Sequence, residues 1–277
     1  MKITIPYTTA ALLLSATMAM GLPQSTAQNP TPSASPSATQ QAAPAKKNPQ
    51  AKSKAEFEAY KAAAAQTDPA KFEAAAVDFA QRFPASELRS LLFQQAMGLY
   101  QQANNSIKTL EMARTVLKYE PTNPVALLTA AQILVERTHN DDLDRNDRLN
   151  EATTDAQTAL QHVNDLIPPP NLTADQFAAA VSQLRGTVHE VLATVAFKKL
   201  DYPAAAREYR DAIAEEKEHT DPVVWLRLAV SYDKDADYLP ALEAVQKAIS
   251  TSEPNSQLRQ VAEQEKARLD SLTPLKK

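Results

Sequence analysis

The stretch from Gly186 to Ser250 repeats one residue pattern, with 36 residues between equivalent positions. The equivalent pairs are Leu192 and Leu228, Ala193 and Ala229, Tyr202 and Tyr238, Ala205 and Ala241, Ala212 and Ala248, and Ile213 and Ile249. Self-similarity at a period of about 20–50 residues is typical of solenoids, in which each repeat packs against its neighbours. This feature predicts a repeat fold before any local propensity is considered.

Small residues recur where the helices of one repeat have to cross closely. Ala193, Ala205 and Ala212 occupy these positions in the first copy, and larger side chains there would hold the helix axes beyond the usual ~8–10 Å. The chain has only 3 Gly and is rich in Ala, Gln, Leu and Glu, which favours helix over strand. We therefore expect an all-α chain.

The repeated residues resemble the tetratricopeptide repeat (TPR). In the second copy the matching positions are Trp225, Leu228-Ala229, Tyr232, Ala241 and Ala248. In the first copy they are His189 as the bulky lead residue, Leu192-Ala193, Ala205, Tyr209 and Ala212. The resemblance implies antiparallel helix pairs stacked into a right-handed superhelical solenoid, and a scaffold that holds protein partners. It identifies no particular ligand.

Earlier segments match the same family order less completely. One unit contains Phe93, Ala96-Met97, Tyr100, Ala113, Val116-Leu117 and Pro121, and the next begins 34 residues later with Leu127, Ala130-Ala131 and Leu134. A degenerate first unit precedes them, as is common at the ends of solenoids. We expect the repeat domain to cover 54–277, with units over about 54–84, 90–121, 124–167, 173–217 and 222–253 and a capping helix over 255–272.

The first 53 residues have a different composition. Lys2, the apolar run that begins at Ala10, and Ser25-Thr26-Ala27 predict a signal peptide over 1–27 that is cleaved after Ala27. An uncleaved membrane anchor is the alternative. Residues 28–53 are rich in Pro, Ser, Ala and Gln, which predicts a disordered linker. The expected location of the protein is therefore periplasmic or secreted.

An insertion over 138–147 delays the second helix of the third unit. Asp142, Asp144 and Asn146 have the spacing of the first calcium ligands in an EF-hand loop, but Thr153 stands where that loop requires a bidentate Glu. A loop that caps the next helix is the preferred interpretation. The helix that follows Thr173 is long for one repeat, and Gly186 in its middle predicts either close packing or a slight bend.

The sequence contains no recognisable catalytic, cofactor or metal motif. The chain has no Cys, too few Gly for a phosphate-binding loop, and no two of its four His at a metal-binding spacing. His189 is expected to pack in the core. The formal net charge of −4 argues against a nucleic-acid partner. We therefore predict no enzymatic activity, no cofactor and no metal.

A binding groove is expected on the concave side, which the first helix of each pair lines in this family. The expected groove residues are Gln94, Gly98, Gln101, Gln102, Leu128, Gln132, Val135, Glu136, Glu190, Thr194, Phe197, Lys198, Val223, Arg227, Val230, Asp233 and Lys234. Cations beside apolar side chains favour the last two units as the binding region. The predicted partner-binding residues are Phe197, Lys198, Arg227, Val230 and Lys234.

The leading functional hypothesis is an exported scaffold or adaptor that binds a protein or peptide of unknown identity. A preformed groove loses little ordering entropy when such a segment docks. One alternative is a solute-binding protein or enzyme whose pocket is formed by the long fourth-unit helix and the 138–147 insertion. Another is a structural component of a cell-envelope assembly. The oligomeric state does not follow from the sequence.

Overall fold

A computed structural model describes residues 49–169 and 171–273 of the 277-residue chain. The described residues form eleven α-helices, two short 3-10 helices and no strand. The α-helices are α1 (Lys54–Ala64), α2 (Pro69–Arg82), α3 (Leu88–Gln102), α4 (Ser106–Tyr119), α5 (Pro124–Arg137), α6 (Arg145–His162), α7 (Ala174–Lys198), α8 (Tyr202–Glu216), α9 (Pro222–Lys234), α10 (Tyr238–Thr251) and α11 (Gln257–Leu272). The predicted signal peptide, the possible anchor and most of the predicted linker lie outside the described residues.

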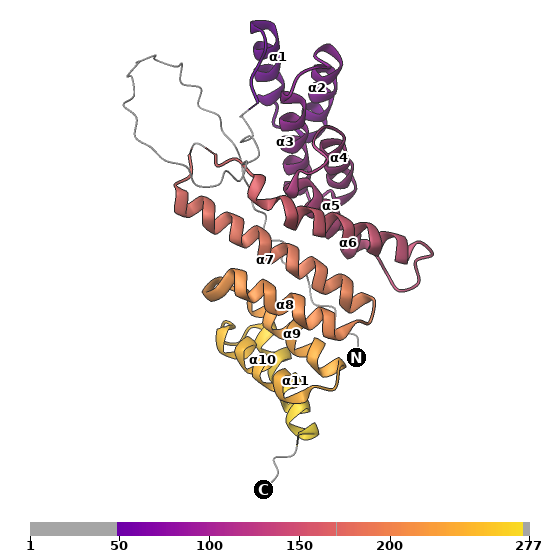
Figure 1. The fold of residues 1–277 in the computed structure, drawn as a ribbon, viewed down its shortest axis with the longest axis vertical. Coiled ribbons are helices and arrows are strands. Elements are labelled where there is room, and N and C mark those ends of the chain that lie inside the picture. Colours follow the sequence, from indigo (N-terminus) through magenta and orange to yellow (C-terminus); the bar gives the residue numbers. More distant parts are fainter. Residues whose placement is uncertain (1–48, 170, 274–277) are drawn as a thin grey trace, which may run out of the picture.

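The helices stack pairwise in chain order, from α1 at one end of the molecule to α11 at the other (Figure 1). The most extensive packing joins the two helices of a pair, as in α7 with α8 and α9 with α10. The first helix of one pair also contacts the first helix of the next, as α5 does with α7. This arrangement confirms the predicted all-α solenoid of TPR-like helix pairs, with α11 packed against α10 and α9 as its last helix.

One turn geometry links the two helices in three of the pairs. The residues that follow α3, α7 and α9 have left-handed backbone angles at Asn104, Leu200 and Ala236, with φ of 53°, 65° and 61°. The next residue in each turn donates its N–H to a carbonyl five residues earlier at 2.9 Å, the signature of a Schellman motif. The 36-residue repeat therefore extends to the backbone of the turns.

Side-chain caps begin most of the helices. Asp68 accepts a hydrogen bond from the backbone N–H of Lys71, and Pro69 occupies the first turn of α2. Thr173 and Gln176 form a reciprocal capping box at the start of α7. These caps fix the first residues of α2 and α7.

Alanines fill the helix crossings as the repeat pattern predicts. Ala193, Ala205 and Ala212 are fully buried, and so are Ala229, Ala241 and Ala248. All six belong to the hydrophobic cluster that joins α7 to α11, with Tyr209, Leu228 and Leu269 between them. Two further clusters cover α1 to α5 and α5 to α7, so the core is continuous along the array.

The insertion after α5 is a short loop that leads into α6 and contacts its first turns. Asp142 accepts a hydrogen bond from the backbone N–H of His139 at 2.8 Å and contacts Arg148 at 3.4 Å. Arg148 also pairs with Asp144 at 2.7 Å. The backbone hydrogen bond from His139 lowers the pKa of Asp142, with a further contribution from Arg148. These contacts hold the loop against the first turns of α6, but Asp144, the N-cap residue of α6, makes no side-chain cap hydrogen bond, so the predicted capping by a side chain is not found.

Helix α7 has 25 residues and extends beyond its partner α8 (Figure 1). The C-terminal end of α8 lies at the level of Ser182, whose hydroxyl contacts the Glu215 carboxylate at 3.0 Å. Gly186 packs against the side chain of Glu216 so closely that an added Cβ would lie 2.6 Å from Glu216 Cγ. Gly186 is therefore a close-packing site.

Within the described ranges, no helix combines the length and apolar character needed to cross a membrane.

Candidate binding surfaces

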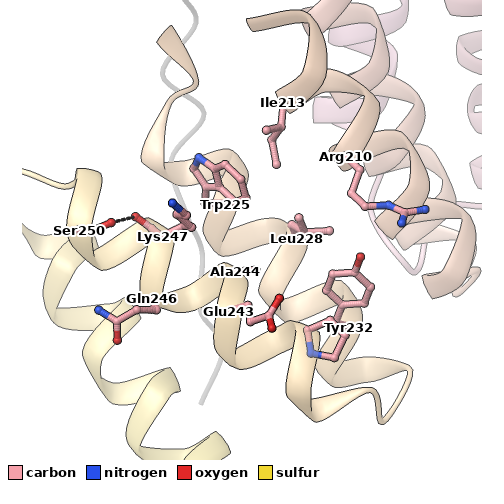
Figure 2. Close-up of a pocket in the computed structure, with 11 residues that line it drawn as sticks. Arg210, Ile213, Trp225, Leu228, Tyr232, Glu243, Ala244, Gln246, Lys247 and Ser250 are labelled. Carbon is pink, nitrogen blue, oxygen red and sulfur yellow. Dashed lines mark hydrogen bonds between the residues drawn. The ribbon is translucent and has the colours of Figure 1, made fainter. Parts of the chain in front are cut away.

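A wide groove lies between the second helices of the last two pairs, α8 and α10, with α9 as its floor. We call it the Trp225 groove. It has a volume of about 660 Å³ and is lined by Arg210, Ile213, Trp225, Leu228, Tyr232, Pro240, Glu243, Ala244, Gln246, Lys247 and Ser250. In Figure 2, Trp225 and Tyr232 lie on either side of Leu228, and Ile213 faces them from α8. The arrangement presents two aromatic rings along one apolar floor.

Charged and polar side chains form the rim of the Trp225 groove. Arg210 extends from α8, and Glu243 and Lys247 extend from α10. All three are exposed. Two cations and one carboxylate give this rim a net positive charge, although the whole chain is acidic. An apolar floor with a few polar groups at its edge is the usual composition of a binding site.

A second groove occupies the equivalent place in an earlier pair. It lies between α2 and α4 above Phe93 of α3, has a volume of about 610 Å³, and includes Met112 and Thr115 in its wall. Met112 and Thr115 stand 19 and 22 residues after Phe93. In the last pair, Ala244 and Lys247 stand at the same two distances after Trp225. The repeat therefore builds an equivalent groove in two pairs. The groove lies over Phe93 in one pair and over Trp225 in the other, and each is the lead residue of its first helix.

Three of the residues predicted from the sequence, Arg227, Val230 and Lys234, lie on the other side of α9. At about 100° per residue, the centre of Trp225, Leu228 and Tyr232 is roughly 160° around the helix from that of Arg227, Val230 and Lys234. We call the surface that contains Arg227, Val230, Lys234, Phe197 and Lys198 the first-helix face.

The structure brings some of these predicted residues together. Lys198 of α7 and Arg227 of α9 both act electrostatically on Glu136 of α5, so charged side chains from three consecutive first helices lie near one another. Burial raises the pKa of Glu136, and Arg227 and Lys198 act in the opposite direction. Lys234, at the end of α9, is exposed.

Two of the predicted cations have intramolecular partners. Arg227 Nη1 lies 3.3 Å from the carboxylate of Glu190, and both side chains are largely buried. Lys198 donates from Nζ to the carbonyl oxygen of Thr138 at 2.6 Å, which ties the insertion to the end of α7. Desolvation lowers the pKa of Lys198, and Arg145 adds to that effect. These two side chains therefore already bind groups of the chain itself.

The two predicted apolar residues of the first-helix face are partly buried. The Phe197 ring meets the Tyr202 ring edge-on at a centroid distance of 5.3 Å. Val230 and Phe197 both pack against the C-terminal hydrophobic cluster. Intramolecular contacts therefore cover part of the first-helix face. The assignment of partner binding to this face remains a prediction.

Two carboxyl groups beside this face have strongly raised pKa values. Burial raises the pKa of Glu190 to about 7, although Arg227 acts in the opposite direction. Burial also raises the pKa of Glu216 to about 7, with additional contributions from Glu190 and Asp221. Both groups therefore take up protons when the chain folds near neutral pH.

We expect this proton uptake to make the folded protein less stable at pH 8 than at pH 5.5. A carboxyl group whose folded pKa exceeds its unfolded value stabilises the fold fully below the unfolded pKa, and this contribution is lost as pH rises through the folded pKa. Glu216→Gln should reduce the difference by about 1 kcal/mol, a figure discounted for partial solvent screening. Urea unfolding at the two pH values tests this. The control is exposed Glu263→Gln on α11, and an unaltered difference in Glu216→Gln contradicts the expectation.

Comparison with known proteins finds similarity among solved structures. No family model matches the chain, and no curated protein matches it. Among solved structures, the chain is similar to the crystal structure of a tetratricopeptide repeat protein from Parabacteroides merdae. The identity is 15%, the match covers 77% of this chain and 90% of that chain, and the TM-score is 0.36. The repeat architecture is established by the helix pairs of this chain.

Proposed function

We propose that this protein is an exported, non-enzymatic scaffold that binds a segment of another protein in the Trp225 groove. The observation that carries the proposal is the groove itself, with Trp225 and Tyr232 on an apolar floor between two helices. Partly exposed aromatic residues in a concave site are the side chains most often found at binding hot spots. Stacked helix pairs hold them rigidly, so little ordering entropy is lost on docking.

The rim of the groove indicates the chemistry of the segment. Arg210 and Lys247 lie on opposite walls, on α8 and α10. An apolar side chain would cover the aromatic floor, and carboxylates on the same segment would meet these two cations. We therefore propose an apolar segment with acidic residues as the partner. The first-helix face is the second candidate surface, because Lys234 is exposed there beside Val230.

A random peptide library tests the proposal while the natural partner is unidentified. Residues 28–277 would be immobilised and used to select displayed 12-residue peptides. The proposal expects enrichment of peptides that combine aromatic or aliphatic residues with Asp or Glu. Selection of predominantly basic peptides, or no enrichment after repeated rounds, would contradict it.

Two alternative functions have distinct requirements. A solute-binding protein or enzyme would need a pocket between α7 and the 138–147 insertion, but Lys198 and Thr138 are joined there by a hydrogen bond. Both grooves described above are lined by other elements. A structural role in a cell-envelope assembly would be compatible with the same fold. It would give a stable complex in envelope extracts but no binding of short peptides.

The proposal that the protein is exported depends on the N-terminal sequence alone. We expect N-terminal sequencing of the mature protein to begin at or near Gln28, because Ser25-Thr26-Ala27 offers small residues for a signal peptidase. A mature chain that keeps Met1 and fractionates with the membrane would support the uncleaved anchor. Intact Met1 in the cytoplasmic fraction would overturn export.

A further inference from the structure

His189, Glu208 and Asp211 form a cluster on the fourth helix pair. His189 extends from α7, and the two carboxylates extend from successive turns of α8. One ligand atom from each side chain lies within 4.8 Å of the other two. The His189 Nδ1 to Glu208 Oε2 distance is 2.8 Å. The His189 side chain is mostly buried and Glu208 is partly so, whereas Asp211 is exposed at the open side.

The cluster occupies the place that holds a groove in two other pairs. Glu208 and Asp211 stand 19 and 22 residues after His189, as Ala244 and Lys247 do after Trp225. In those pairs the lead residue is aromatic and the neighbouring second helices leave an open groove above it. In the fourth pair the same architectural position carries an imidazole and two carboxylates. His189, Glu208 and Asp211 therefore stand at the positions that line a groove in the other two pairs, but an imidazole and two carboxylates suit a cation.

We propose that His189, Glu208 and Asp211 bind a divalent transition-metal ion of the Zn²⁺ class. One imidazole nitrogen and two carboxylate oxygens are ligands that such ions accept, at metal–ligand distances of about 2.0–2.2 Å. Ligand atoms around a tetrahedral ion at those distances are about 3.4 Å apart. The present separations, 2.8 Å between His189 Nδ1 and Glu208 Oε2 and at most 4.8 Å among the three ligand atoms, lie on either side of that spacing. The proposal does not depend on peptide binding in the Trp225 groove.

Asp211 distinguishes the metal site from a simple ion pair. The contact between His189 and Glu208 is complete without a third residue. That contact raises the pKa of His189, and Asp211 and Glu215 add to the effect. An ion must displace the imidazole proton, so it competes with the protonated pair. A three-ligand site requires Asp211, whereas the ion pair does not.

The test is a calorimetric titration of untagged, chelator-treated residues 28–277 with Zn²⁺. The proposal predicts one ion per chain with a Kd below about 10 µM, and at least about tenfold weaker binding in both His189→Ala and Asp211→Asn. The matched control is His162→Ala, because His162 Nδ1 contacts Asp165 at 2.7 Å in a similar histidine–carboxylate pair on α6 and the turn that follows it. That variant should bind Zn²⁺ as the unaltered chain does. Circular dichroism checks that each variant is folded.

Asp211→Asn keeps the proposal testable if His189→Ala does not fold, because Asp211 is exposed and its replacement preserves shape. Zn²⁺ should also raise the melting temperature of the unaltered chain and of His162→Ala, but not that of Asp211→Asn. Binding weaker than about 10 µM in the unaltered chain would overturn the proposal. An Asp211→Asn loss smaller than tenfold, or an equal loss in His162→Ala, would overturn it as well.

Discussion

Replacing Trp225 with alanine is expected to weaken peptide binding by at least about 30-fold. Trp225 is the largest side chain of the groove floor, and removing a central aromatic residue from an interface typically costs at least about 2 kcal/mol, or about 30-fold in Kd. The measurement is a titration of each variant with a peptide selected from the library. Trp225→Phe should lose less, because it keeps a ring on the floor.

The control for this variant lies on the opposite side of the same helix. Lys234→Glu changes the charge of the first-helix face and leaves the contact between Arg227 and Glu190 in place. We expect it to bind the selected peptide normally. If Trp225→Ala folds and binds as before while Lys234→Glu loses affinity, the first-helix face is the binding surface.

Replacing Ala212 or Ala248 with leucine is expected to destabilise the fold by about 1–3 kcal/mol. Both alanines are fully buried at helix crossings, so three additional carbons force the axes apart or drive side chains out of their preferred rotamers. Leucine and alanine are both strong helix formers, so intrinsic helix propensity contributes little to the difference. Thermal and urea unfolding of each variant measure the effect.

Ala214→Leu is the matched control for these variants. It makes the same change on α8 at an exposed position, two residues from Ala212. Its stability should change by less than about 0.5 kcal/mol. If Ala212→Leu and Ala248→Leu unfold like the unaltered chain, the close crossings inferred from the repeat do not determine stability.

The fold was predictable because its determinants are local and periodic. The small residues at 36-residue spacing identify the helix crossings, and capping residues such as Asp68 and Thr173 locate helix starts within a few positions of the chain. Even Gly186 was recognisable as a possible close-packing site, since glycine inside a long helix requires a reason. Each of these signals comes from neighbouring residues or from one repeat.

The surfaces were harder to predict because they depend on how repeats stack. A period identifies equivalent positions, but it does not say which side of a first helix stays open. The sequence therefore selected Arg227 as a binding cation, although Glu190 lies 37 residues away in the chain and contacts it in the fold. His189 was expected to pack in the core because the repeat normally holds an aromatic residue at its position. Its side chain is mostly buried, but its contact with Glu208 of the following helix was not predicted. The one sequence signal for these surfaces was the constant spacing of 19 and 22 residues between the lead residue of a first helix and two positions on the second helix.

Tryptophan emission tests the central claim most directly. Trp225 is the single tryptophan of the 277-residue chain, so the intrinsic emission reports on this groove alone. On addition of a selected peptide, we predict an emission shift that saturates with the same Kd as a calorimetric titration of the same pair. Calorimetric binding at saturation with unchanged Trp225 emission would contradict the claim that the groove between α8 and α10 holds the partner.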